Sequence, residues 1–245
     1  MIKSVSERQR ANLYRLCIPL QAQTFEELET KISQAFGSAD LVEIWLDQLP
    51  VAEKAGLEKL EKIIAAAHML EMEVLLLLRS LAKKRFQTLL EAIKYGADFV
   101  DIDMTSNPAL IKKIVRAARA TGAARVSPSN RTSIILSCHN FTRTPPLVEL
   151  KKIAASGKKL GADIVKIITT ARKPRDNLVI FKLLAQSLAH PPAGVHAHAP
   201  ALIAHCMGEY GKISRILAPF YGSYISYVAL DQNSRTAPGQ LTLNH

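Results

Sequence analysis

Cysteine and aromatic residues are scarce in this chain. Three cysteines stand among 245 residues. Their odd number and lack of CxxC spacing exclude the disulfide framework of a small secreted protein and the usual zinc motifs. Aromatic residues make up only 6% of the chain, whereas hydrophobic residues of all kinds make up 48%, so the core must be mainly aliphatic. We therefore expect a protein of a reducing compartment, the cytoplasm.

Long apolar runs and linker segments are also missing. No run approaches the roughly 20 apolar residues of a membrane-spanning helix, and residues 1–16 lack the apolar core of a signal peptide. There is no Pro/Gly/Ser-rich linker and no low-complexity tract. We expect one domain over residues 1–245, with residues 1–12 as a flexible N-terminal segment and no membrane partner.

Acidic residues are outnumbered, 21 against 32 lysines and arginines, which gives a net charge of +11. Many of the basic residues occur as pairs on helix-like stretches, such as Lys112–Lys113, Lys151–Lys152 and Lys158–Lys159. Aromatic residues are not interleaved with them, as a surface that stacks nucleotide bases would require. The excess charge therefore predicts solvated helix faces and no nucleic-acid partner.

What the chain does contain is a regular alternation of strand-like and helix-like segments. The strand-like runs are Tyr14–Leu20, Leu41–Leu46, Val74–Arg79, Phe99–Met104, Ser133–His139, Ile164–Thr169, Leu202–Met207 and Tyr224–Leu230. The helix-like segments are Phe25–Ala35, Leu57–Leu70, Phe86–Tyr95, Pro108–Ala120, Leu147–Lys159 and Asn177–Ala189. Asn107 should cap a helix that begins at Pro108, and Gly96, Gly122 and Gly161 should end helices.

Eight such units predict an α/β protein, a single-domain (β/α)8 TIM barrel. The alternative is a doubly wound sheet, which would normally carry a glycine-rich phosphate loop after its first strand. Residues Pro19–Gln23 contain no glycine. The barrel is therefore favoured, and its chemistry should lie at the carboxyl ends of the strands. The polar or functional residues at those ends are Asp47, Arg79, Asp103, His139, Lys166 and Met207, with Glu43 inside its strand.

Lys166 is the most informative of these residues, because it stands between β-branched residues in the run Ile164–Ile168. A lysine that loses its hydration has a lowered pKa, and the neutral amine is a nucleophile toward carbonyl groups. Two other interpretations stay open. The side chain could snorkel outward between helices, or it could pair with an acid such as Asp101 or Asp103.

Two histidine positions offer further chemistry. His139 ends a strand, where an imidazole can act as general acid or base near neutral pH, although a structural histidine is about as common there. His196 and His198 lie close together in GVHAHAP, but no acidic or cysteine partner stands at helical spacing. We therefore expect no metal site and favour His139 as the acid–base group.

Five segments together resemble the successive signatures of type I 3-dehydroquinate dehydratase. They are Glu43–Asp47, Ser137–Phe141, Asp163–Ile167, Met207–Arg215 (the pattern MGxxGxxSR) and Ala237–Gln240 (APGQ). Their order and spacing match the family from about Tyr14 to Leu241.

The resemblance implies a (β/α)8 barrel that converts 3-dehydroquinate to 3-dehydroshikimate in the shikimate pathway without cofactor or metal, and a homodimer. It implies that Lys166 forms an imine with the substrate ketone and that His139 is the general acid and base. It also implies that Arg215 holds the substrate carboxylate. The other substrate-binding positions it implies are Glu43, Arg79, Met207, Thr236 and Gln240, with Thr236 where the family commonly has serine.

The chain departs from the family pattern at two positions. Trp45 replaces the arginine of Glu-x-Arg-x-Asp, and Lys83 replaces a glutamate that often orients the histidine. Losses of this kind predict activity lower by roughly 10- to 1000-fold, unless neighbouring groups compensate. Two other functions stay open: another Schiff-base lyase, aldolase-like, with a phosphate cradle at Tyr221–Ser223, and a weakened barrel kept for binding or regulation.

Overall fold

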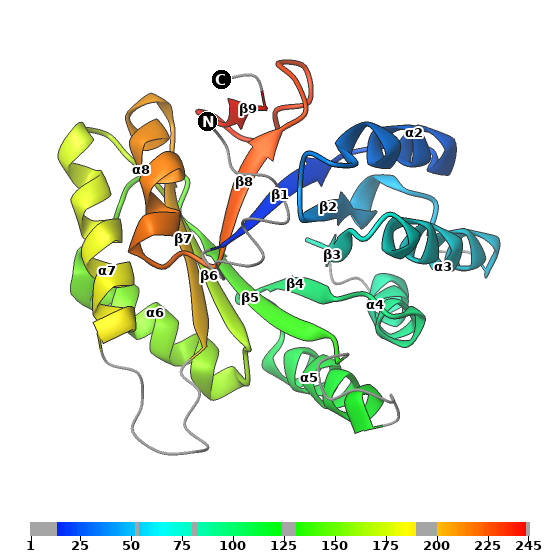
Figure 1. Ribbon diagram of the computed structural model, residues 1–245. Helices are drawn as coiled ribbons and strands as arrows, with labels where there is room; N and C mark the ends of the chain where they lie inside the picture. The colour runs from blue at the N-terminus through cyan, green and yellow to red at the C-terminus, as the bar shows by residue number, and fades with distance from the viewer. Residues whose placement is uncertain (1–13, 52–53, 80–82, 124–130, 190–199, 244–245) are drawn as a thin grey trace. The chain divides into compact units, whose positions relative to one another are not determined.

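The computed structural model describes residues 14–51, 54–79, 83–123, 131–189 and 200–243 (Figure 1). It divides into two compact units. One comprises residues 17–135, and the other comprises residues 136–245 together with 1–16. The prediction of a single domain stays a prediction, and the N-terminal segment 1–12 lies outside the described residues. Among the described helices, none combines the length and the apolar character that crossing a membrane requires.

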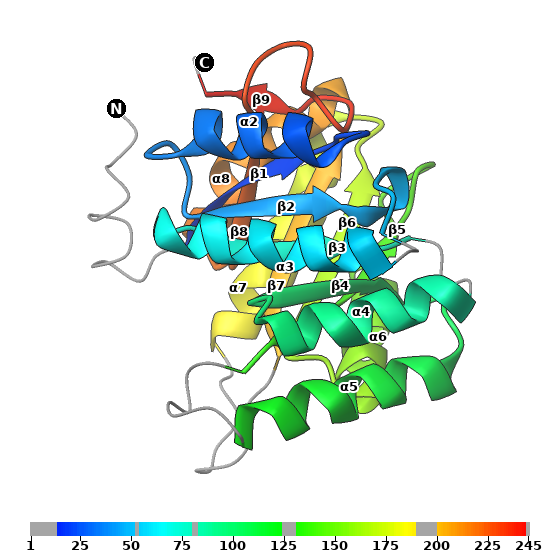
Figure 2. The same ribbon diagram turned by 90° about the vertical axis from the view of Figure 1, so that its right-hand side faces the viewer.

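The first unit, residues 17–135, is built from parallel strands with a helix after each. Its strands are β1 (Arg15–Leu20), β2 (Leu41–Trp45), β3 (Glu73–Leu77) and β4 (Phe99–Asp103), and its helices are α2 (Phe25–Ala35), α3 (Lys54–Met69), α4 (Lys83–Tyr95) and α5 (Pro108–Ala123), with the short 3-10 helix η1 (Leu46–Gln48) after β2. Each strand pairs in parallel with the next. Figure 2 shows α3, α4 and α5 side by side along one face of these strands. The aliphatic strand residues are therefore buried, as parallel sheets require.

The second unit continues the alternation. Its strands are β5 (Ser133–His139, which begins in the first unit), β6 (Ile164–Thr170), β7 (Ala201–Met207), β8 (Ile225–Ala229) and β9 (Leu241–Thr242). Its helices are α6 (Leu147–Leu160), α7 (Asn177–Ala189) and α8 (Lys212–Leu217), with short 3-10 helices η2 (Pro174–Asp176), η3 (Glu209–Gly211) and η4 (Ala218–Tyr221). Strand β6 pairs in parallel with β7, and β8 with β9. The Tyr224 amide donates to the Leu202 carbonyl at 2.8 Å, which brings the start of β8 beside β7.

All eight predicted strands and all six predicted helices are confirmed, with ends that differ by up to three residues. The Asn107 cap is confirmed, because its side-chain oxygen accepts the Ala109 amide at 2.8 Å. Gly96 and Gly161 follow α4 and α6 in the left-handed region, as expected. The prediction for Gly122 was wrong, since α5 continues to Ala123. Strand β9 and the short helix α8 were not predicted.

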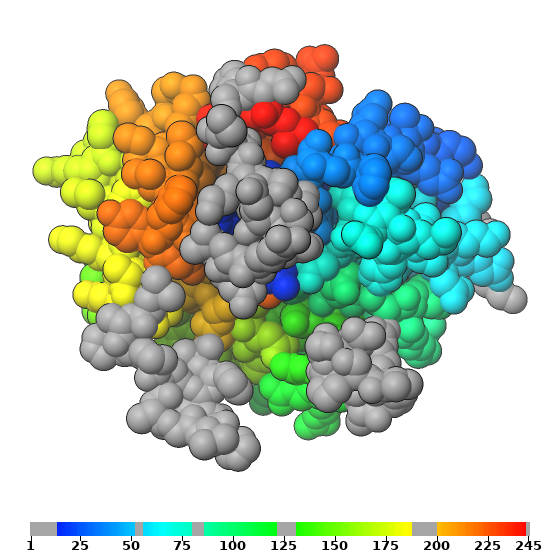
Figure 3. All heavy atoms as spheres, viewed as in Figure 1, coloured from blue at the N-terminus to red at the C-terminus, as the bar shows by residue number. Residues whose placement is uncertain are grey.

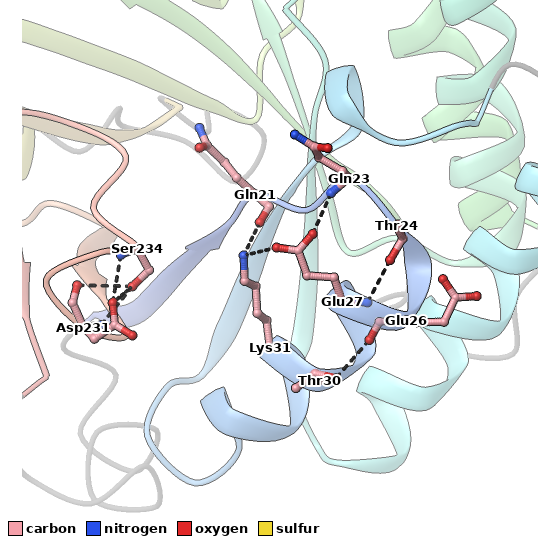
Figure 4. Close-up of polar contacts among 9 residues, drawn as sticks. All are labelled: Gln21, Gln23, Thr24, Glu26, Glu27, Thr30, Lys31, Asp231 and Ser234. Atoms are coloured by element: carbon pink, nitrogen blue, oxygen red, sulfur yellow. Dashed lines mark hydrogen bonds and ion pairs between the residues drawn. The ribbon is translucent and has the colours of Figure 1, made fainter.

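Local polar contacts hold the loop after β1, the segment without glycine (Figure 4). Thr24 caps α2 by accepting the Glu27 amide at 3.1 Å, and the Glu27 carboxylate accepts the Gln23 amide at 2.9 Å. Lys31 donates to the Gln21 carbonyl and to Glu27, both at 2.6 Å. This reciprocal capping gives the loop its shape without a special backbone conformation.

Candidate active site

Lys166 lies in β6 and is buried, with 5% of its surface exposed. Its Nζ atom lies over the ring of Tyr227, 4.6 Å from the centroid. The interpretation that this side chain snorkels to solvent is therefore wrong. An aromatic face attracts a cation, so the ring supports a protonated nitrogen at this position. The alternative of an acidic partner, Asp101 or Asp103, stays a prediction, because those residues belong to the other unit.

Strand β7 places two more side chains on the Lys166 face of the sheet. In the register of β6 and β7, Lys166 stands opposite Ile203, and His205 and Met207 follow at intervals of two residues. Both His205 and Met207 are buried. The His205 ring lies 5.9 Å from that of Tyr227. The sequence analysis missed His205 and Tyr227. Alternate residues of a strand share a face, so His205, two residues before Met207, could have been found from the sequence.

His205 is held in its neutral form. Burial is the main reason that its pKa lies well below 6.5, and the positive charges of Arg215, Lys166 and His139 lower the pKa further. A neutral imidazole beside Lys166 adds no charge of its own to the site. The arrangement therefore concentrates positive charge on Lys166 and Arg215, which suits an anionic substrate.

The MGxxGxxSR segment connects the end of β7 to α8 and brings Arg215 inward. A side chain on Gly211 would approach the Cys206 carbonyl oxygen to 2.5 Å, so only glycine fits this contact. Ser214 receives the Cys206 amide and donates to the Gly211 carbonyl, both at 2.8 Å. These contacts fasten the first turn of α8 to β7 and explain why small residues stand at 211 and 214.

Arg215 is consequently buried, with 4% exposure. Its Nη2 atom donates to the Pro238 carbonyl at 3.3 Å. Its buried Nε atom has no hydrogen-bond partner among the described residues. Burial lowers the pKa of Arg215 to about 10, and the nearby Cys206 thiol opposes this shift. A buried guanidinium with an unused Nε donor is prepared to bind an anion such as a carboxylate.

The APGQ segment packs its backbone against the turn after β7. The Pro238 carbonyl accepts the Gly208 amide at 3.1 Å in addition to Arg215. Gly239 has a φ of +73°, and a side chain there would meet the Gly208 carbonyl oxygen at 2.3 Å. Gln240 is buried, and its side-chain oxygen accepts both the amide and the hydroxyl of Thr236, at 2.8 and 3.1 Å. The segment thus accepts a bond from Arg215 through the Pro238 carbonyl and bonds from Thr236 through the Gln240 side chain.

His139 ends β5 and is half-buried. Its ring stacks on Phe141, with centroids 5.8 Å apart and planes 10° apart. The next amide, that of Asn140, donates to the Ile168 carbonyl at 2.8 Å, so His139 stands beside the end of β6. The Asn140 side chain also accepts the amides of Thr142 and Arg143. The imidazole is thus supported by its ring neighbour and by a fixed turn.

Glu43 and Arg79 belong to the first unit. Glu43 is buried in β2, with 2% exposure, and Arg79 is exposed, two residues beyond the end of β3. Strands β2 and β3 end at Trp45 and Leu77, before the predicted ends at Leu46 and Arg79. Beyond these strands, Asp47 lies in η1 and accepts the Arg79 amide at 2.9 Å. Trp45 contacts both residues: its Nε1 donates to Glu43 at 2.9 Å, and the Arg79 guanidinium carbon lies 4.3 Å from its ring centroid.

Some predicted positions lie outside what the structure describes. His196 and His198 are among the residues left undescribed, as is the side chain of Lys83, which begins α4. Among the described residues, no cluster of three or more histidine, cysteine, aspartate or glutamate side chains is arranged to hold a metal ion.

Sequence comparisons with known proteins identify the family. A model described as type I 3-dehydroquinase matches residues 16–245. A 3-dehydroquinate dehydratase of Pyrococcus abyssi is 37% identical over 161 residues, which cover 66% of this chain and 63% of that protein. One of Methanosarcina barkeri is 31% identical over 231 residues, covering 89% and 87%. The crystal structure of 3-dehydroquinate dehydratase from Geobacillus kaustophilus matches with a TM-score of 0.78 at 20% identity, over 94% of this chain and 87% of that one. The structural likeness confirms the predicted (β/α)8 barrel fold class.

Proposed function

The chain belongs to the type I 3-dehydroquinase family, and we propose that Lys166 and His139 carry out its dehydration of 3-dehydroquinate to 3-dehydroshikimate. The reaction class, a carbon–oxygen lyase of the shikimate pathway, follows from the family. The observation that carries the assignment of residues is the buried Lys166 amine over Tyr227, on the same strand face as His205 and Met207.

In the first step Lys166 gives up its proton and the resulting neutral amine attacks the C3 ketone, and loss of water leaves an imine. Protonation of that imine makes it an electron sink, so the C2 proton can leave and its electron pair forms an enamine. Expulsion of the C1 hydroxyl, protonated as it departs, then gives the conjugated imine. Hydrolysis by one water releases 3-dehydroshikimate and restores Lys166. Tyr227 stabilises the protonated nitrogen through its ring face.

His139 acts as the general acid and base of these steps. It removes the C2 proton and delivers a proton to the departing C1 hydroxyl, a role suited to a group that titrates near neutral pH. It is half-buried at the end of β5, with its ring stacked on Phe141.

Arg215 binds the substrate carboxylate. The support is a buried guanidinium with an unused donor, joined through the Pro238 carbonyl to the loop that carries Thr236 and Gln240. Gln240 uses its oxygen on Thr236, so its amide N–H groups can donate to the same carboxylate or to a hydroxyl. Met207 packs against the substrate ring, and Glu43 and Arg79 bind the substrate hydroxyls.

The test is turnover, measured by the ultraviolet absorbance of the conjugated product. Lys166→Met keeps the length and apolar stem of the side chain but removes the amine, so we expect no activity above background and a folded protein by circular dichroism. Lys151→Met removes an exposed lysine of α6 and serves as the matched control, with activity unchanged. Full activity of Lys166→Met would refute the imine mechanism.

The aldolase-like alternative has less support. That enzyme would need a phosphate cradle, for which Tyr221–Ser223 offered only a thin case, and this segment precedes β8 and thus lies at the amino end of that strand. Ser223 is buried, and its hydroxyl already contacts the Ala204 amide and the Ile225 carbonyl, both at 3.2 Å. A phosphate site would need donors at the carboxyl end instead.

A homodimer is part of the proposal. Helix α8 turns Ser214 and Arg215 inward, whereas Ile213 and Ile216 are each 51% exposed. Further exposed apolar side chains continue this surface over α7, η3 and η4: Leu178, Tyr210, Leu217, Phe220 and Tyr221. Figure 3 shows the α7–α8 surface, yellow to orange, turned toward the viewer. A surface helix normally has a polar outer face, so an apolar one suits burial against a second copy.

Sedimentation velocity tests the dimer. We expect the wild-type protein to sediment as a dimer and Ile216→Glu as a monomer, whereas Lys151→Glu on α6 serves as a control and stays dimeric. A wild-type monomer at micromolar concentration would contradict this part of the proposal.

We also place the protein in the cytoplasm. None of its three cysteines forms a disulfide, and Cys17 and Cys206 are buried. Buried thiols of this kind are typical of proteins that fold in a reducing compartment. Fractionation of the native host, followed by immunodetection, would test the location directly.

A further inference from the structure

Trp45 ends β2, and it contacts both of the residues assigned to the substrate hydroxyls. Glu43 and Trp45 are two residues apart and therefore share a strand face. The indole Nε1 donates to Glu43 Oε1 at 2.9 Å. The Arg79 guanidinium carbon lies over the indole ring, 4.3 Å from its centroid.

The hydrogen bond to Glu43 has a direct consequence for that carboxylate. An indole has a single donor, and here it is directed at one oxygen of a side chain that is only 2% exposed. A bond from a neutral donor to a charged acceptor is among the stronger hydrogen bonds of proteins. It restricts the rotation of the carboxylate group.

The stacking contact orders Arg79 in a similar way. Arg79 is exposed and would otherwise sample many rotamers. The contact with the indole ring, 4.3 Å from its centroid, restricts the guanidinium to the neighbourhood of that ring. The Arg79 amide is also bonded to Asp47 at 2.9 Å, so both ends of the residue are anchored.

We propose that Trp45 is a positioning residue, which orients Glu43 through its N–H group and Arg79 through its ring face for binding of the substrate hydroxyls. This proposal rests on the proposed function. An arginine at this position would offer its own donors to the substrate and would place a second cation beside Arg79. Trp45 instead acts through its two neighbours.

Kinetic variants separate the two contacts. Trp45→Phe keeps a ring under Arg79 and removes the donor to Glu43, whereas Trp45→Leu removes both contacts. We expect Trp45→Phe to raise KM about 10-fold, the loss expected for one hydrogen bond to a charged group, with kcat changed by less than about 3-fold. Trp45→Leu should raise KM further. In a Glu43→Gln background, Trp45→Phe should add less than about 2-fold, because its effect passes through the Glu43 carboxylate.

Indole fluorescence gives a readout that needs no catalysis. Trp45 is the only tryptophan of the chain, so all indole emission of the free protein comes from it. Glu43→Gln and Arg79→Met should each change the intensity or the wavelength of this emission. Lys59→Met is the matched control, because it removes a cation from an aromatic ring elsewhere in the same unit, 5.6 Å from the centroid of Phe25. This control should leave the emission unchanged.

The outcomes distinguish the proposal from the function on which it rests. If the wild-type protein turns over 3-dehydroquinate but Trp45→Phe has an unchanged KM, or if the effects of Trp45→Phe and Glu43→Gln simply multiply, the positioning role is refuted and the dehydratase stands. If the wild-type protein shows no turnover, the proposed function fails. In that case the indole emission of the Glu43→Gln and Arg79→Met variants still decides whether Trp45 contacts these two side chains.

Discussion

Replacement of Arg215 by methionine should make the free protein more stable while abolishing its response to ligand. Burial lowers the pKa of Arg215 to about 10. At about 1.4 kcal/mol for each pKa unit, a lowering of this size corresponds to a cost on the order of 3 kcal/mol for keeping the charge inside the folded protein. Arg215→Met removes that cost, fills most of the same volume, and loses one long hydrogen bond to Pro238, worth about 1 kcal/mol. The net expectation is a gain of about 1–2 kcal/mol in the free energy of unfolding.

The ligand should reverse the order of stability. A product that binds only the folded protein stabilises it by about 2.7 kcal/mol at 100 times its Kd, and the carboxylate contact to Arg215 provides much of that affinity. Urea unfolding with and without saturating 3-dehydroshikimate measures both quantities. Lys212→Met on the same helix is the control: its exposed ion pair with Glu209, at 2.7 Å, should change stability by less than about 1 kcal/mol.

Two results would refute this reasoning. A free Arg215→Met protein that is less stable than wild type by more than about 1 kcal/mol would mean that the buried charge contributes to the fold. An equal stabilisation of both proteins by the product would mean that Arg215 does not bind the carboxylate.

Three further predictions concern the same site. Below pH 6.5 the unfolded chain binds a proton at His205 and the folded chain does not. The free energy of unfolding should therefore fall by up to about 1.4 kcal/mol per pH unit as the pH drops below 6.5. In urea titrations His205→Leu should flatten this slope, and an unchanged slope would assign it to other groups. Gly211→Ala places a side-chain carbon 2.5 Å from the Cys206 carbonyl oxygen. It should lower the free energy of unfolding by about 1–3 kcal/mol and reduce kcat/KM by moving α8. A normal melting temperature would show that the turn relaxes freely. Tyr227→Leu should lower kcat about 3- to 10-fold, because it removes the ring face from the protonated imine. Tyr227→Phe should keep kcat within about 2-fold of wild type. Equal losses of kcat in the two variants would implicate the hydroxyl instead.

The alternation of aliphatic strands with amphipathic helices was enough to predict the elements of the fold. Strand ends were less accurate, because they depend on contacts that no local pattern contains, such as the bond from the Arg79 amide to Asp47. Strand β9 has only two residues, and it exists because Val228 and Ala229 provide a partner. A segment so short has no periodicity to detect.

The candidate site was predicted where a residue type was out of place in its surroundings. Lys166 in an apolar strand is such a case, and its burial is confirmed. His205 and Tyr227 resemble ordinary core residues in the sequence, and only the register of β6 and β7 and the ring contacts bring them to Lys166. The part played by Trp45 was also hidden, because its departure from the family pattern indicates a loss, whereas its contacts to Glu43 and Arg79 indicate a replacement.

Borohydride trapping tests the central claim most directly. The protein is incubated with 3-dehydroquinate and reduced, its intact mass is measured, and the modified peptide is mapped. The imine mechanism predicts one stable adduct per chain, located on Lys166, and none on Lys166→Met. An unmodified, folded wild-type protein, or an adduct on another lysine, would contradict the assignment of Lys166 as the catalytic amine.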